Sequence, residues 1–234
     1  MPPTPRLFPM GDQALVVEFG DRIDSTLSLH IASLAAQLRE SRLPGVTDIV
    51  PAYTTLALHY DPAALGGGTS PYEALAEALS AWLNDPSAGE QATGRTVEIP
   101  VCYGGAYGED LETLAHARGL SVDEAIALHS ATTYHVHMLG FVPGFAYLGG
   151  LDARLAMPRR DSPRPRVPAG SVGIGGEQTG VYPLETPGGW QIIGRTPLQL
   201  FQPQVMPPCL LSAGDTVRFV PIPERQFLSL APAA

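Results

Sequence analysis

Residues 133–139 have the sequence TYHVHML, in which Tyr134, Val136 and Met138 alternate with two histidines. An alternation of period two is typical of a strand with one buried face. Further short apolar runs follow between turn-forming residues, at 171–174, 190–193, 198–201 and 216–220. Glycine and proline, 25 and 24 of 234 residues, far exceed their usual combined share of about 12%. Several short strands, many turns and no further helix favour an antiparallel barrel, closed or nearly closed.

Upstream of this segment the pattern changes to helices. A strand at 96–101 is followed by helices at 110–118 and 122–131, and Ser121 with Glu124 forms a capping box at the second. Two helices at this spacing resemble a DNA-binding helix-turn-helix. The second helix, however, begins with two acids that phosphates would repel, and the chain has no lysine. The pair therefore predicts a structural hairpin, and we expect no nucleic-acid partner.

The N-terminal part of the chain predicts a small α+β domain. Strands are expected at 13–19, 46–50 and 54–60, and helices from Asp24 to before Pro44 and at 70–83. With the strand at 96–101, the order is β-α-β-β-α-β, the ferredoxin-like arrangement. Residues 84–94 are small, polar and without periodicity, which indicates a linker. We therefore divide the chain into an α+β domain at 1–92 and a barrel domain at 93–234.

Composition excludes several classes of protein. All 14 basic residues are arginine, so this chain alone cannot be a P-loop enzyme, a protein kinase or a pyridoxal-phosphate enzyme, each of which needs one lysine. A genome rich in arginine codons would give the same composition, and the exclusions hold in that case too. Cys102 and Cys209 are far apart, which favours neither a disulfide framework nor a metal site. With no signal-like or membrane-spanning run, we expect a cytoplasmic protein without membrane contact.

Positive charge gathers in one segment of an otherwise acidic chain. The net charge is −9, yet residues 151–200 hold six arginines and four acids. Prolines stiffen the run that carries Arg159, Arg164 and Arg166, and a guanidinium is a planar fork suited to carboxylate or phosphate. Hydrogen bonds to a small polar ligand could come from Gln178, Tyr182 and Glu185. We expect an anion-binding pocket here; the alternative is that these arginines pair with acidic residues and hold the barrel together.

Three blocks of sequence carry a resemblance to a known family. They are MLGFVPGFAYL at 138–148, PRRDSPRPRVPAGSV at 158–172 and QTGVYPLETPGGWQIIGRTP at 178–197. In this order and spacing they resemble the KipI / allophanate hydrolase subunit 1 family. The similarity extends to GDQALVVEFG at 11–20 and AGDTVRFVPI at 213–222, so it covers essentially the whole chain.

The resemblance implies a fold and an activity. Family members have a small α+β N-terminal domain and a cyclophilin-like β-barrel, and bacterial members include the B subunit of ATP-dependent 5-oxoprolinase. Such a chain is inactive alone. It works with a KipA-type sister subunit and a third, lactam-utilisation subunit on a small lactam or amide, and ATP is used by the assembled complex. The family also includes KipI itself, so the alternative is a regulator that inhibits a sensor histidine kinase by binding.

The resemblance also adds candidate site residues. Phe145 and Arg195 lie in the first and third blocks, and His129 matches a histidine that the family often carries before the first block. We count all three as candidate substrate-binding residues, whereas no general base is assigned. His135 and His137 match no motif, and we expect both on the barrel surface.

Overall fold

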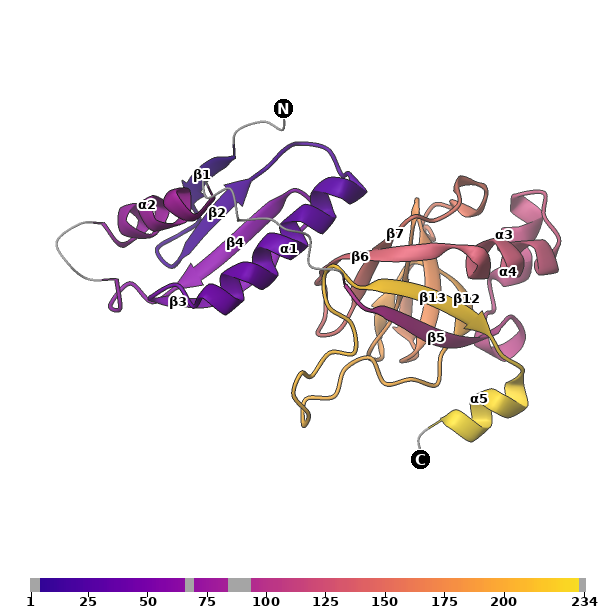
Figure 1. Ribbon diagram of the computed structural model, residues 1–234. Coiled ribbons are helices and arrows are strands. Elements are labelled where there is room, and N and C mark those ends of the chain that lie inside the picture. Colours follow the sequence, from indigo (N-terminus) through magenta and orange to yellow (C-terminus); the bar gives the residue numbers. More distant parts are fainter. Residues whose placement is uncertain (1–4, 66–69, 84–93, 232–234) are drawn as a thin grey trace. The chain divides into compact units, whose positions relative to one another are not determined.

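The computed structural model describes residues 5–65, 70–83 and 94–231. The chain divides into two compact units, Met1–Thr93 and Gly94–Ala234 (Figure 1). The predicted linker at 84–94 lies outside the described residues except for Gly94. Within the described residues, none of the helices is both long and apolar enough to cross a bilayer.

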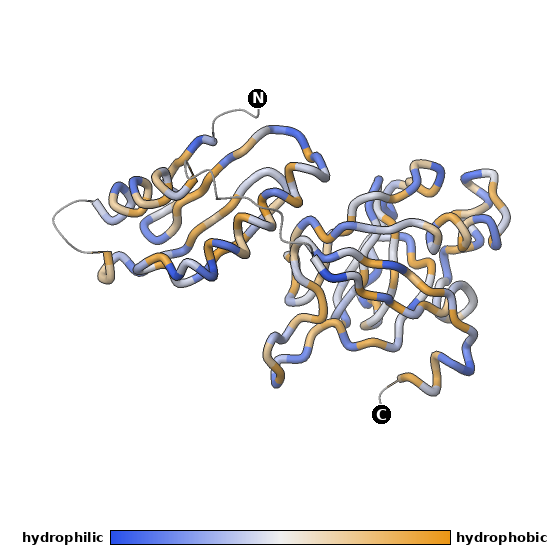
Figure 2. Tube along the Cα trace, in the orientation of Figure 1, coloured by the Kyte–Doolittle hydropathy of each residue, from blue (hydrophilic) through white to orange (hydrophobic). Residues whose placement is uncertain are grey.

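The N-terminal unit is an antiparallel sheet with two helices. Its strands, in the order β1-β2-β4-β3, are β1 (Arg6–Pro9), β2 (Ala14–Glu18), β4 (Thr55–Tyr60) and β3 (Val46–Pro51). The helices are α1 (Ser25–Ser41) and α2 (Pro71–Leu83), and both alternate between hydrophobic and hydrophilic residues along their length (Figure 2). As predicted, Asp24 caps α1, because its Oδ1 accepts a hydrogen bond from the Leu27 amide at 2.9 Å.

The ferredoxin-like detail of the prediction is not confirmed. The strand expected to complete it, β5 (Thr96–Tyr103), pairs with strands of the second unit instead. The fourth strand of the N-terminal sheet is β1, a short segment that ends in a proline and has no alternating pattern. The order is therefore ββαββα, and the sheet is complete without β5.

The C-terminal unit confirms the predicted closed barrel. Around it run β10 (Gln178–Val181), β7 (Ala146–Gly149), β6 (Thr133–Leu139), β13 (Thr216–Pro221), β5, β12 (Gln191–Arg195) and β9 (Ser171–Gly175). All neighbours pair antiparallel except β5 and β13, which pair in parallel and differ in this from the expected antiparallel barrel. A separate ribbon is formed by β8 (Arg164–Val167) and β11 (Thr186–Gly188).

In the described part of this unit, three short α-helices lie beside barrel strands. The predicted hairpin is α3 (Leu111–Ala117) and α4 (Val122–Ala131), with both bonds of the Ser121–Glu124 capping box present. Two short 3₁₀ turns lie at Gly105–Tyr107 and Ala153–Leu155. Two expectations were wrong: α5 (Glu224–Leu230) is a helix after the strands, and residues 198–201 form only one isolated bridge, Phe201 with Cys209.

The expected surface position of His137 was also wrong. A β-bulge shifts the pairing of β6 with β7 between Val136 and Met138, and such a bulge interrupts the strict alternation of faces. His137 is therefore buried next to Val136, with 3% of its surface exposed, whereas His135 is partly exposed.

Candidate functional site

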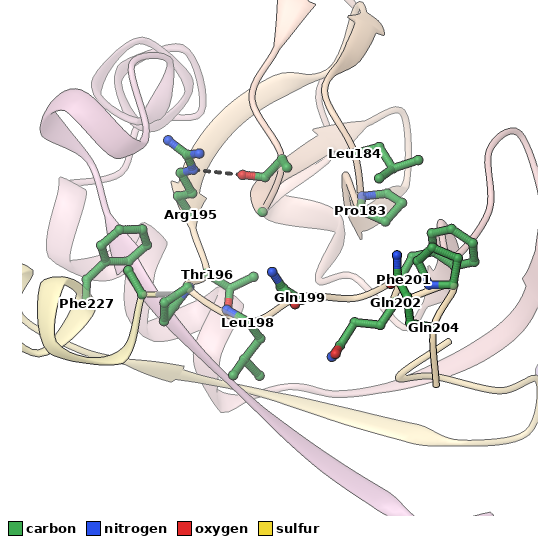
Figure 3. Close-up of a pocket in the computed structure, with 15 residues that line it drawn as sticks. Pro183, Leu184, Arg195, Thr196, Leu198, Gln199, Phe201, Gln202, Gln204 and Phe227 are labelled. Carbon is green, nitrogen blue, oxygen red and sulfur yellow. Dashed lines mark hydrogen bonds between the residues drawn. The ribbon is translucent and has the colours of Figure 1, made fainter. Parts of the chain in front are cut away.

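A groove of about 640 Å³ on the C-terminal unit is the candidate site (Figure 3). It is formed by the turn before β9, the loop after β10, the chain that leaves β12 and one side of α5. Its lining residues are Ala169, Gly170, Pro183, Leu184, Arg195, Thr196, Pro197, Leu198, Gln199, Phe201, Gln202, Pro203, Gln204, Phe227 and Ala231.

Among these lining residues, Arg195 is the one ionisable side chain. Its Nε donates a hydrogen bond to the Ala169 carbonyl at 2.8 Å, the dashed line of Figure 3. No carboxylate of the described residues lies within ion-pair distance of its guanidinium, and the side chain is partly exposed. One edge of the guanidinium is thus held by the protein, and the other donors can serve a ligand.

Gly170 brings the two sides of the groove together. Its φ of 82° lies in the left-handed region, and a Cβ there would overlap the carbonyl oxygen of Thr196. The backbone closes this approach, because the Thr196 amide donates to the Gly170 carbonyl at 2.9 Å. Because Gly170 has no side chain, the turn can lie directly against Thr196, and this fixes the position of the neighbouring Arg195 relative to the turn.

The rest of the groove is neutral. Figure 3 shows Arg195 and Phe227 toward one end and Phe201, Gln202 and Gln204 toward the other. The glutamine side chains supply amide donors and acceptors, and leucine, proline and phenylalanine side chains supply apolar walls. One cation, several amides and apolar walls suit a small anion that also carries a polar amide group.

Arg164 is engaged by protein carboxylates. Its Nη2 lies 2.7 Å from Asp110 Oδ1 and its Nε 2.8 Å from Glu109 Oε1, and 15% of its side chain is exposed. Asp110 also accepts hydrogen bonds from Arg160 Nη1 at 3.1 Å and from the Ile192 amide at 2.6 Å. These ion pairs agree, for Arg164, with the alternative that the arginines pair with acidic residues and hold the barrel together. The contacts join the start of α3 to β8 and β12.

Other predicted residues form an aromatic face beside this network. The rings of Phe145 and Tyr182 lie 5.5 and 6.4 Å from that of Trp190, and burial raises the pKa of Tyr182. The exposed guanidinium of Arg159 lies over the Trp190 ring at 6.0 Å. Arg166 is 81% exposed, and its closest carboxylate is that of Glu185 at 3.7 Å. A binding role for these residues stays a prediction.

His129 lies in the interior of the unit rather than in the groove. Its ring nitrogens are 2.7 Å from the Tyr103 hydroxyl and 3.0 Å from Thr179 Oγ1, and none of its surface is exposed. Complete burial lowers the pKa of His129 to about 3, so the ring is neutral. Gln178, the residue before Thr179, is partly exposed at the start of β10. Among the described residues, no group of histidine, cysteine, aspartate and glutamate could hold a metal ion.

The structure thus does not bring the predicted residues together in one place. Arg195 is in the groove and His129 is internal. Arg164 and Arg166 belong to β8, Arg159 and the aromatic residues lie at Trp190, and Gln178 begins β10. The sequence interpretation did not select Gln199, Gln202, Gln204 or Phe227. The glutamines lie in an irregular run without charge that ends before Asp215, whereas Phe227 lies beyond it in α5.

Comparisons with known proteins agree over most of the chain. A family model described as carboxyltransferase domain, subdomain C and D, matches residues 5–211, which include all groove residues except Phe227 and Ala231. The B subunit of 5-oxoprolinase from Bacillus subtilis (strain 168) is 46% identical over 223 residues, 93% of each chain. The protein of that name from Escherichia coli O157:H7 is 45% identical over 217 residues, 92% of this chain and 95% of its own. The crystal structure of TTHA0988 matches with a TM-score of 0.78 at 38% identity, covering 90% of this chain but 40% of that longer one.

Proposed function

The chain belongs to the family of carboxyltransferase domains, subdomain C and D, and we propose that it is the B-type subunit of an ATP-dependent 5-oxoprolinase complex. The complex opens the lactam of 5-oxoproline to give glutamate and hydrolyses ATP to ADP and phosphate. The observation that carries the proposal is the similarity, over nearly the full length, to two bacterial proteins of that name, at 46% and 45% identity. We place the complex in the cytoplasm, where ATP is available.

Within this function, the groove binds the substrate. The free donors of Arg195 bind the carboxylate of 5-oxoproline, because a guanidinium presents paired N–H groups to two carboxylate oxygens. The amides of Gln199 and Gln202 offer both a donor and an acceptor, which match the lactam carbonyl and N–H. The apolar side chains of Leu198 and Phe227 cover the ring carbons.

This chain does not supply the chemistry that opens the lactam. Among the described residues that line the groove there is no carboxylate, imidazole or thiol that could act as a general base or nucleophile. The sequence also has no lysine to handle the phosphates of ATP. We therefore assign acid–base catalysis and ATP binding to the sister subunits, of the KipA type and the lactam-utilisation type.

The test is 5-oxoproline-dependent ADP release by this chain co-expressed with the sister subunits of the same genome. An Arg195→Ala variant should raise the KM for 5-oxoproline about 10- to 100-fold, because a hydrogen bond to a charged group contributes about 1.5–3 kcal/mol. Arg195→Lys should recover only part of this, since it keeps the charge but loses the planar fork.

The matched control is Arg218→Ala, which removes an exposed arginine of β13 that pairs with the exposed Glu98. It should leave KM unchanged. An assembled complex that releases no ADP with 5-oxoproline would show that the proposed substrate is wrong. Full activity with Arg195→Ala would show that the carboxylate binds elsewhere.

A further inference from the structure

Two segments of the C-terminal unit carry no charge. Residues 138–151 and 196–214 contain no aspartate, glutamate, lysine, arginine or histidine, although 16% of the whole chain is charged. The structure brings the two segments together: a Cβ at Gly144 would lie 2.9 Å from Phe201 Cβ. A small pocket of about 380 Å³ is lined by residues 139–144 of the first segment and Cys209 of the second.

Large apolar side chains are exposed on both uncharged segments. Phe141 is 62% exposed, Val205 48% and Met206 91%. We call these three residues, with the pocket between their loops, the neutral patch. Phe141 has a φ of 70°, a left-handed conformation that is rare for a bulky residue and is found where surrounding structure imposes it. The loop between β6 and β7 thus holds an aromatic ring at the surface in an unfavourable backbone conformation.

The neutral patch adjoins the groove. Phe201, Gln202 and Gln204 line the groove (Figure 3). Val205 and Met206 follow Gln204 directly in the chain. A protein seated on the patch would therefore reach the end of the groove away from Arg195. The groove itself lacks a general base among its described lining residues, so this is the position from which a second protein could supply one.

We propose that the neutral patch is the docking surface for a sister subunit, which completes the groove with acid–base groups of its own. The inference rests on the proposed function and names the surface through which the complex assembles. Aromatic and methionine side chains without charge are typical of the fully buried centre of a protein–protein interface. In TTHA0988 the region that matches this chain is 40% of a longer chain. There, such a region is joined to a further part that the match does not cover, which favours a different subunit over a second copy as the occupant of the patch.

The experiment measures the dissociation constant between this chain and the purified sister subunits of the same genome, by calorimetry without substrate or ATP. Met206→Glu and Phe141→Glu each place a carboxylate in the patch, where docking would remove its water without giving it a partner. Each should weaken binding at least tenfold. The matched control is Ile23→Glu, because Ile23 is 61% exposed and belongs to the N-terminal unit; it should bind as the parent does.

Thermal melting establishes whether each variant is folded. If Phe141→Glu is not folded, the binding of Met206→Glu alone tests the docking surface. Parent-like binding by Met206→Glu overturns the proposal, as does a parent chain that binds neither sister subunit. Sedimentation of the parent chain alone supplies a further check: self-association that Met206→Glu abolishes would make the occupant a second copy. Because binding is measured without turnover, a complex that forms through the patch but does not hydrolyse 5-oxoproline refutes the proposed function and leaves the docking surface supported.

Discussion

Replacing Asp110 by alanine should destabilise the C-terminal unit strongly. The Asp110 side chain is 8% exposed and receives three hydrogen bonds, from Arg164 at 2.7 Å, Arg160 at 3.1 Å and the Ile192 amide at 2.6 Å. These groups belong to β8, to the segment before it and to β12. One carboxylate thus connects the start of α3 to two strands that are distant in sequence.

The size of the effect follows from what the substitution leaves behind. Removing one partner of a buried ion pair costs about 3–5 kcal/mol, because the other charge stays buried. Arg164 keeps Glu109, but that side chain is 61% exposed, and such a pair contributes only about 0–1 kcal/mol. Arg160 is 39% exposed and can turn to water. We therefore expect a loss of about 3–5 kcal/mol, and a melting temperature lower by about 10 °C or more for a domain of this size.

The assay is thermal and urea unfolding of Asp110→Ala and Arg164→Ala beside Asp161→Ala, which removes an exposed aspartate and should change little. In the assembled complex, Arg164→Ala should keep the parent KM for 5-oxoproline. A melting temperature of Asp110→Ala within about 2 °C of the parent would refute the reasoning. A raised KM for Arg164→Ala without loss of stability would return Arg164 to the substrate site.

Two further predictions concern His129 and Gly170. The pKa of His129 is about 3 in the folded chain and near 6.5 in the unfolded chain. Between these two pH values, the unfolded chain binds a proton at His129 that the folded chain does not bind. The free energy of unfolding that the neutral His129 contributes is complete above pH 6.5 and should fall toward pH 3 by about 1.4 kcal/mol per pH unit. Urea midpoints measured between pH 7 and 4.5 should show this slope for the parent and a smaller slope for His129→Gln. Equal slopes for the two proteins would contradict the prediction. Gly170→Ala adds a Cβ against the Thr196 carbonyl at a positive φ. It should therefore lower stability by about 1–3 kcal/mol and raise the KM for 5-oxoproline. The control is Gly176→Ala, which is also at positive φ but in open space and should keep the parent KM.

Local signals in the sequence predicted much of the fold. The capping residues Asp24 and Ser121 mark real helix starts, and the alternation at 133–139 marks a real barrel strand. Each of these depends on residues within a few positions of one another. The closed barrel could be inferred from them because many short strands with tight turns must bury one face.

Features that depend on distant contacts could not be predicted in this way. The partners of Arg164 are Glu109 and Asp110, more than fifty residues earlier in the chain, and no periodicity connects them. The bulge that buries His137 depends on pairing with β7. The groove glutamines are polar residues in an irregular segment, and only the fold around Gly170 brings them opposite Arg195.

The parallel pairing of β5 and β13 affects how the protein is made. Thr96 lies opposite Thr216, and the pairing continues to Val101 with Pro221. During synthesis, β5 therefore leaves the ribosome long before its neighbour exists and waits with an unpaired edge, to which another nascent chain could add a strand. Contacts across so many residues also favour slow folding. The barrel should therefore close late, when β13 inserts between β5 and β6, and until then the free edge of β5 is a site for misassembly.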